Sequence, residues 1–219
     1  AQALAPLAPR FFSVTYGAGG STRDLTHDSA HVLRRTSGLP VAAHLTCVGA
    51  SKAETLEVAD SFAEIGVTDI VALRGDPENG APTFTPHADG FADSVELIEA
   101  LAKTGKFTLR VGAYPEPHPE SHDQAQNVEW LKRKFDAGAD EAITQFFFET
   151  ETFLRFRDAC AAAGITKTIT PGIMPVTNWK SARNFATRCG ASVPAALDEA
   201  YAAAIRDDRH DLLSTALCT

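Results

Sequence analysis

Short apolar runs rich in β-branched and aromatic residues recur along the chain, and each predicts a strand. These runs occupy residues 11–16, 41–47, 68–73, 108–114, 142–148 and 168–173. Amphipathic stretches that end at a glycine separate the runs, and they predict helices because glycine best adopts the left-handed C-cap conformation. The glycines are Gly38, Gly66, Gly105, Gly138, Gly164 and Gly190. The pattern predicts a strand-then-helix unit repeated six times.

Two of the predicted helices begin with a capping box, in which two side chains three residues apart satisfy unpaired amides at the helix start. The pairs are Ser51 with Glu54, and Ser121 with Gln124. We therefore expect helices to start after Ser51 and Ser121.

The predicted strands are typical of a parallel sheet covered by helices, because runs such as residues 70–73 are apolar on both faces. Polar or turn-forming clusters follow almost every strand, which favours a (β/α)8 TIM barrel over an open doubly wound sheet. Six units are two short of eight. We therefore expect an α/β fold in which residues 1–219 form a single TIM-barrel catalytic domain, with the first and last strands missing and the chain truncated at both ends.

Composition points to small-molecule chemistry. Twenty Lys and Arg residues face 28 Asp and Glu residues, and the resulting net charge of −8 disfavours nucleic acid or an anionic membrane as a partner. No apolar run is long enough to span a bilayer, and the first ten residues do not resemble a signal peptide. Four scattered cysteines without a CxxC pair are typical of reduced thiols. We expect a cytoplasmic protein.

Several motifs leave two interpretations open. The glycine-rich stretch 17–23 fits neither dinucleotide nor phosphate-loop patterns, and is a tight turn or a backbone approach to a ligand. Residues 74–76 (RGD) form a structural ion pair or a functional pair, and the proline-spaced loop 114–120 is a stiff surface loop or a binding loop.

Three further features are most simply explained without a binding role. The basic run 132–134 is most simply a solvated helix end, and the phenylalanines at 146–148 are most simply core residues. The spacings of His44 with Cys47 and of His118 with His122 lack further ligands, so we expect no metal site.

Seven ordered blocks resemble the methylenetetrahydrofolate reductase family over essentially the whole chain. They are SVTYGAGGSTRDLTH at 13–27, HLTC at 44–47, VALRGDP at 71–77, AYPEPHPE at 113–120, LKRKFDAGAD at 131–140, AITQFFF at 142–148 and PGIMPV at 171–176. The resemblance implies a TIM barrel that binds FAD. NAD(P)H would reduce the FAD, which would then reduce 5,10-methylenetetrahydrofolate to 5-methyltetrahydrofolate, a step of one-carbon metabolism and methionine biosynthesis.

The resemblance also implies roles for individual residues. Thr15 and Gln145 would contact the nicotinamide nucleotide, and Gln145 would also reach the folate. Phe185 would pack on bound substrate or nucleotide, and Asp76 would hydrogen-bond the pterin and stabilise cationic character on the folate. The implied FAD-lining residues are Tyr16, Ala18, His44, Arg74, Gly75, Asp76, Ala92, Tyr114, His118, Ser121, Arg133 and Lys134.

The chain departs from the family pattern at Asn127, where an acid is usual, at Trp130, and at Ser181, where a folate-contacting glutamine often stands. The opening motif with the family's general-acid glutamate and the closing strand with a folate-binding arginine are not in these residues. Two alternatives therefore stay open: a flavin-independent, NADH-using reductase of the same family, and a non-catalytic remnant that binds FAD or folate. The expected partners are methylenetetrahydrofolate and NAD(P)H, with a homo-oligomer left open.

Overall fold

The computed structural model describes residues 2–16, 23–77, 81, 83–118, 120–121 and 123–218. The chain divides into two compact units. Unit 1 comprises Ala1–Gly112 and Arg133–Glu141, and unit 2 comprises Ala113–Lys132 and Ala142–Thr219. Two positions of the predicted sites, Ala18 and His122, lie outside the described residues.

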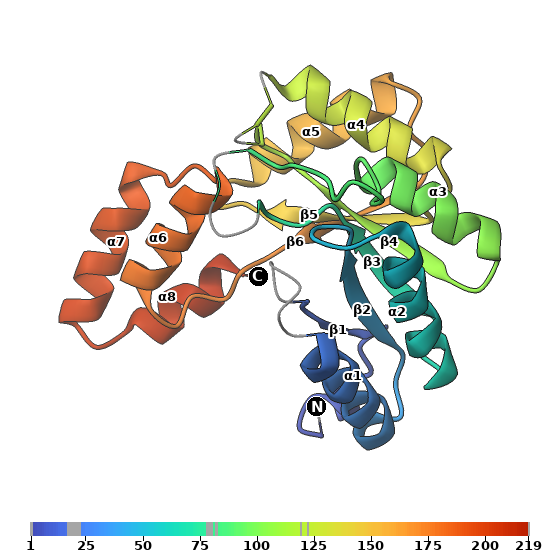
Figure 1. The fold of residues 1–219 in the computed structure, drawn as a ribbon. Helices are drawn as coiled ribbons and strands as arrows, with labels where there is room; N and C mark the ends of the chain where they lie inside the picture. The colour runs from blue at the N-terminus through green and yellow to red at the C-terminus, as the bar shows by residue number, and fades with distance from the viewer. Residues whose placement is uncertain are drawn as a thin grey trace. The chain divides into compact units, whose positions relative to one another are not determined.

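Unit 1 is built from strands that alternate with helices. After a 3-10 turn η1 (Ala5–Leu7), its elements are β1 (Phe12–Val14), α1 (Arg23–Ser37), β2 (Val41–Thr46), α2 (Lys52–Glu64), β3 (Asp69–Leu73), α3 (Ser94–Thr104) and β4 (Thr108–Ala113). Neighbouring strands are parallel, with Phe12 opposite Val41, Ala42 opposite Asp69, and Asp69 opposite Thr108. Helices α1, α2 and α3 pack against this sheet (Figure 1).

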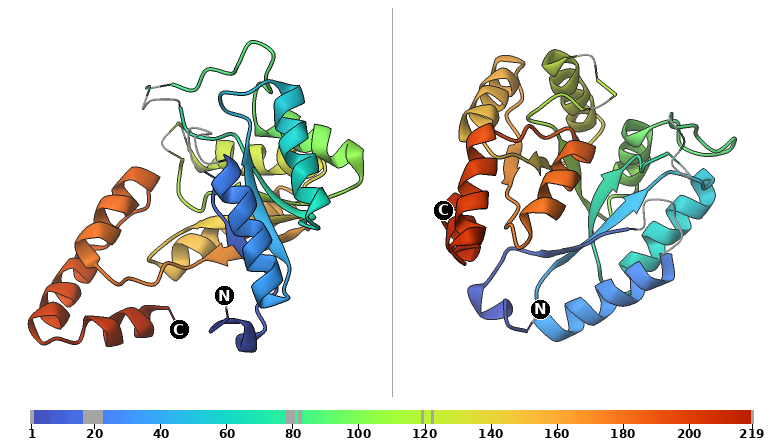
Figure 2. Two further views of the ribbon diagram at one scale, coloured as in Figure 1. Left: turned by 60° about the horizontal axis from the view of Figure 1, so that its bottom comes forward. Right: turned by 90° about the vertical axis from the view of Figure 1, so that its left-hand side faces the viewer.

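Helix α4 (Gln124–Asp136) runs from unit 2 into unit 1. The remaining elements are β5 (Glu141–Phe146), α5 (Thr150–Ala162), β6 (Thr168–Gly172), α6 (Trp179–Cys189), α7 (Ala195–Arg206) and α8 (His210–Leu217). In Figure 2, α6, α7 and α8 follow β6 without an intervening strand. This run of three helices departs from the simple strand-then-helix repeat.

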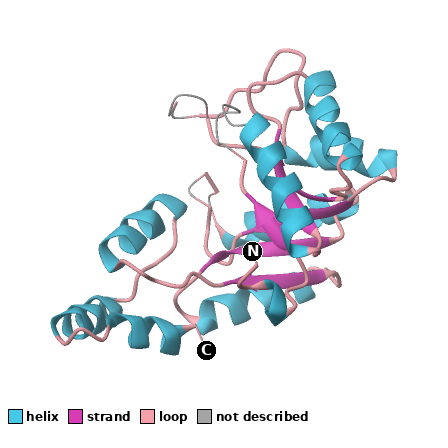
Figure 3. Ribbon diagram, turned by 90° about the horizontal axis from the view of Figure 1, so that it is seen from below, coloured by secondary structure: helices cyan, strands magenta, loops and turns pink. Residues whose placement is uncertain are grey.

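The six strands lie in sequential order, β1-β2-β3-β4-β5-β6, and appear in magenta among the helices of Figure 3. Sequential order is that of a (β/α)8 barrel, whereas a doubly wound sheet reverses its order at a switch point. The predicted α/β fold with barrel topology is therefore confirmed for these strands, and each predicted run overlaps an observed strand. β2 is buried along nearly its whole length, which fits a strand covered on both faces.

The six predicted C-cap glycines all have positive φ, and the Ser51–Glu54 capping box is present at the start of α2. The second predicted capping box is wrong. Helix α4 begins at Gln124, and Asp123 Oδ1 accepts the N–H of Gln126 at 2.9 Å. The Gln124 side chain instead donates to the carbonyl oxygen of Tyr114 at 3.0 Å.

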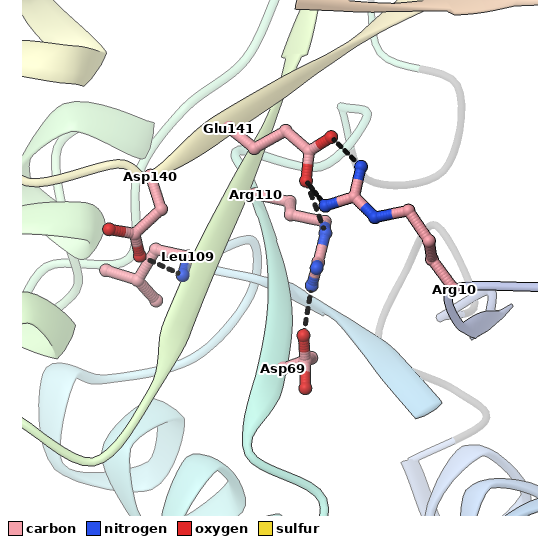
Figure 4. A network of polar contacts seen from close by, with 6 residues as sticks. All are labelled: Arg10, Asp69, Leu109, Arg110, Asp140 and Glu141. Carbon is pink, nitrogen blue, oxygen red and sulfur yellow. Dashed lines mark hydrogen bonds and ion pairs between the residues drawn. The ribbon is translucent and has the colours of Figure 1, made fainter. Parts of the chain in front are cut away.

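An ion network in unit 1 joins the amino ends of three strands to the segment before β1 (Figure 4). Arg110 of β4 pairs with Asp69 of β3, and its Nε donates to Glu141 Oε2 of β5 at 3.2 Å. Arg10 also pairs with Glu141, with 3.3 Å between Nη1 and Oε1. The Arg110 and Glu141 side chains are each 7% exposed. This network lies at the strand ends opposite those that carry the predicted site.

Candidate functional site

In unit 1, the turn after β3 packs closely against the end of β2. The Cys47 thiol lies 3.4 Å from the Arg74 carbonyl oxygen, to which it donates a hydrogen bond. Gly75 has a φ of +93°, and a Cβ atom there would lie 2.6 Å from Val48 Cγ1 and 3.1 Å from Thr46 Cβ. Because neither the conformation nor the space accepts a side chain, Gly75 is required at this turn. The α-carbon of Gly75 therefore packs directly against the end of β2.

Arg74 is held above an aromatic ring. Its guanidinium carbon lies 4.7 Å from the centre of the Phe84 ring, and its Nε donates to the Gly75 carbonyl oxygen at 3.3 Å. The next residue, Asp76, is exposed. The turn thus places the Arg74 cation and the exposed Asp76 carboxylate on either side of Gly75, which has no side chain.

Lys134 brings a second cation to the carboxyl end of the sheet. Although it stands near the end of α4, its Nζ donates to the carbonyl oxygen of Gly112 in β4 at 2.7 Å. Burial, together with the positive charge of Arg74, lowers its pKa to about 8, and Asp93 opposes the shift. The prediction of a solvated basic helix end is therefore wrong for Lys134, whereas the neighbouring Arg133 is exposed.

The remaining predicted residues of unit 1 differ in their surroundings. Burial lowers the pKa of His44, so its imidazole is neutral at pH 7 and acts as a hydrogen-bonding group rather than a cation. Thr15 is exposed, and its carbonyl oxygen accepts the Thr26 hydroxyl at 3.2 Å. Tyr16 is half-buried just after β1. Ala92 is exposed, and its N–H donates to Glu96 Oε2 at 2.7 Å.

In unit 2, the loop after β4 is anchored by side chains of α4. Gln124 donates to the Tyr114 carbonyl oxygen, and Asn127 Nδ2 donates to the carbonyl oxygens of Glu116 at 3.0 Å and Tyr114 at 3.5 Å. The rings of Tyr114 and His118 meet edge to face, with centroids 4.7 Å apart. The loop is therefore built into the fold, rather than being stiffened by its prolines alone.

The same loop is tied at two further points. The His118 carbonyl oxygen accepts the N–H of Ser121 at 2.7 Å. The Glu116 carboxylate accepts the N–H of Ser192 at 2.9 and 3.1 Å, which connects the loop to the turn after α6.

An aromatic platform in unit 2 includes the predicted Phe185 of α6. Its ring stacks on buried Phe146, with centroids 5.5 Å apart and planes 22° from parallel, yet the residue is 41% exposed. Gln145, which precedes Phe146 in sequence, is half-buried, and its Oε1 accepts the Phe146 N–H at 3.1 Å. Phe146 and Phe148 belong to core clusters, as predicted for at least two of the three phenylalanines.

Sequence reasoning missed two residues at the site in unit 1. Asp93 caps α3 by accepting the N–H groups of Val95 and Glu96 at 2.8 and 3.0 Å, and it lies close enough to Lys134 to influence its pKa. The D-x-x-E spacing of Asp93 and Glu96 is the signal that could have revealed this cap. Thr46 stands two residues after His44, so strand alternation puts both on one face of β2.

Within the described ranges, no group of three or more His, Cys, Asp or Glu residues is arranged to hold a metal ion. Among the helices in the same ranges, none combines the length and apolar character needed to cross a bilayer.

Comparison with known proteins gives consistent matches. The family model for methylenetetrahydrofolate reductase matches residues 1–216. The 5,10-methylenetetrahydrofolate reductase of Pectobacterium carotovorum subsp. carotovorum is 46% identical over 192 residues, which are 87% of this chain and 62% of that protein. The enzyme of the same name from Escherichia coli (strain K12) is 43% identical, over 88% of this chain and 63% of that protein. The chain thus spans less than two thirds of the length of these relatives.

Solved structures with little sequence identity share the fold alone. An oxaloacetate acetylhydrolase in complex with oxalate is 17% identical, with a TM-score of 0.57 over 94% of this chain and 75% of that one. A 2,3-dimethylmalate lyase is 14% identical, with a TM-score of 0.54 over 94% of this chain and 77% of that one.

Proposed function

This chain belongs to the methylenetetrahydrofolate reductase family, and from that premise we propose that the full-length protein reduces 5,10-methylenetetrahydrofolate to 5-methyltetrahydrofolate, with FAD as cofactor and NAD(P)H as electron donor. The observation that carries the flavin assignment is the pair of cations at the carboxyl ends of β3 and β4. Arg74 and Lys134 raise each other's electrostatic energy, and Lys134 carries the additional cost of burial. An anionic ligand offsets both costs.

The residues of unit 1 fit a dinucleotide such as FAD. Arg74 and Lys134 would hold the diphosphate, because cations at short range are the usual partners of phosphate oxygens. Gly75, which has no side chain and packs against Val48, would border the flavin through its backbone. Neutral His44 would offer a hydrogen bond to the flavin without adding a third positive charge.

The residues of unit 2 fit planar, partly polar substrates. The exposed face of Phe185 would pack on the nicotinamide or the pterin, since aromatic rings favour stacked contacts. Gln145 would orient these rings through its amide. Tyr114, whose backbone carbonyl oxygen accepts from Gln124 and Asn127, would contribute a further aromatic ring.

When bound, FAD would supply the two-electron chemistry that passes from NAD(P)H to the methylene carbon. Asp76 would stabilise cationic character on the folate as its ring opens, because a carboxylate favours a nearby developing positive charge. Thr15 and Tyr16 would border the nicotinamide and the flavin.

The absorption spectrum of the purified full-length protein, with and without added FAD, tests this proposal. We expect the visible band of an oxidised flavin, and we expect anaerobic NAD(P)H to bleach it without folate. Methylenetetrahydrofolate should then restore the band. Turnover with NADH in a protein that never takes up FAD would instead support the flavin-independent reductase, and neither FAD uptake nor turnover would support a non-catalytic remnant.

A further inference from the structure

The hydroxyl group of Thr46 is a buried polar group without a partner. Thr46 is the last residue of β2 and is 6% exposed. Among the described residues, no atom is placed to form a hydrogen bond with its Oγ1, which is itself inaccessible to water. A hydroxyl that has lost water and gained no partner destabilises the folded protein.

Other buried threonines of the chain do not share this feature. The Thr55 hydroxyl donates to the Ser51 carbonyl oxygen at 2.9 Å, and the Thr26 hydroxyl donates to the Thr15 carbonyl oxygen at 3.2 Å. The Thr144 hydroxyl accepts the N–H of Gly172 at 2.8 Å. Thr46 therefore carries a cost that these residues avoid, at a position where a valine would have nearly the same shape.

The location of Thr46 links its hydroxyl to the site. It lies opposite Leu73 in the register of β2 and β3, and its Cβ is next to the bare α-carbon of Gly75. His44 lies on the same face of β2, two residues earlier. A threonine hydroxyl can both donate and accept, and a change of rotamer about the Cα–Cβ bond presents its oxygen to a different neighbour.

We propose that Thr46 is a binding residue for the flavin nucleotide, and that its hydroxyl forms a hydrogen bond with an oxygen or nitrogen of that ligand at the carboxyl end of β2. This assignment rests on the proposed function. The unpaired hydroxyl then destabilises the free protein and gains a hydrogen-bond partner when the nucleotide binds.

The test compares Thr46→Val with wild type and with Thr55→Val, all as full-length protein stripped of FAD. Urea unfolding reports the stability of the free protein, and quenching of flavin fluorescence reports FAD affinity. We expect Thr46→Val to raise the unfolding midpoint while weakening FAD binding about tenfold, the loss typical of one hydrogen bond. Thr55→Val should lower the midpoint and leave FAD affinity unchanged.

Thr46→Ser keeps the hydroxyl and should bind FAD within a fewfold of wild type, which separates the hydroxyl from the shape of the side chain. Unchanged FAD affinity in Thr46→Val would overturn the assignment. So would a lowered unfolding midpoint in that variant, because it would show that the hydroxyl is paired in the free protein. Failure of the wild type itself to bind FAD would reject the flavin-dependent function, and this assignment with it.

Discussion

Lys134 lowers the stability of the folded protein and places a positive charge at the candidate site. Its Nζ donates a short hydrogen bond to Gly112, but burial and Arg74 make its protonated form less favourable than in water. A basic residue near the end of a helix is usually solvated and stabilising. Here the side chain turns toward the sheet instead, so the same residue becomes a cation available to a ligand.

The pH dependence of stability should report this environment. The pKa of Lys134 falls from 10.5 to about 8 on folding, so the unfolded chain binds this proton more tightly. The contribution of Lys134 to the free energy of unfolding should therefore rise between about pH 8 and pH 10.5. Lys134→Met should remove that part of the slope in urea unfolding curves. Arg133→Met, at the exposed neighbouring position, should retain it, and equal slopes in wild type and Lys134→Met would contradict the assignment.

At the scale of elements, the loop after β4 and helix α4 form one structural piece. An acid is usual at position 127 in the family, but a carboxylate could not donate to the two carbonyl oxygens that Asn127 Nδ2 contacts. Asn127 is 5% exposed, so these contacts are shielded from water. In this chain, position 127 therefore anchors the loop that carries Tyr114.

Asn127→Asp should destabilise the protein by about 1–3 kcal/mol at pH 7, because a buried carboxylate would replace a donor that faces two acceptors. The deficit should shrink as the pH falls and the new carboxyl group takes up a proton with which it can donate. Gln126→Glu makes the same change in charge at an exposed position of α4 and should cost little. Urea unfolding at two pH values measures both effects. A pH-independent loss in Asn127→Asp would show that the donor is not what matters.

Local sequence signals predicted the elements of this fold well. Each of the six strands follows from a run of β-branched or aromatic residues, and each C-cap glycine follows from a backbone conformation that glycine adopts most easily. The contacts of Lys134 and Asn127 could not be predicted, because they depend on where α4 packs rather than on its own pattern. The failed Ser121 capping box has the same cause, since Gln124 serves Tyr114 instead of the helix start.

At the scale of the whole chain, the strands of unit 1 separate two kinds of chemistry. Their carboxyl ends carry the candidate site, and their amino ends carry the network of Arg10, Asp69, Arg110 and Glu141 (Figure 4). In barrel enzymes, the carboxyl ends hold the functional groups and the amino ends contribute to stability. The network is therefore expected to govern unfolding, not substrate affinity.

Two arginines of this network offer a matched comparison, because both pair with Glu141. Arg110→Met should destabilise the protein by about 3–5 kcal/mol, since it leaves half-buried Asp69 and buried Glu141 without their shared cation. Arg10 has a side chain that is 72% exposed, so Arg10→Met should cost at most about 1 kcal/mol. Chemical unfolding of the two variants measures the difference. Similar losses would mean that Arg110 contributes no more than a surface pair, and neither variant should change FAD affinity.

Two glycines of the chain differ in how freely evolution can replace them. Gly105 has a φ of +65° and open space around its α-carbon, so lineages could drift to asparagine there at modest cost. Gly75 has a φ of +93° and is also hemmed in by Val48 and Thr46, so replacing it would require simultaneous changes in its neighbours. Mutational libraries should accordingly sample asparagine at position 105 and keep position 75 fixed, because only the first substitution leaves a viable background on which further changes can accumulate.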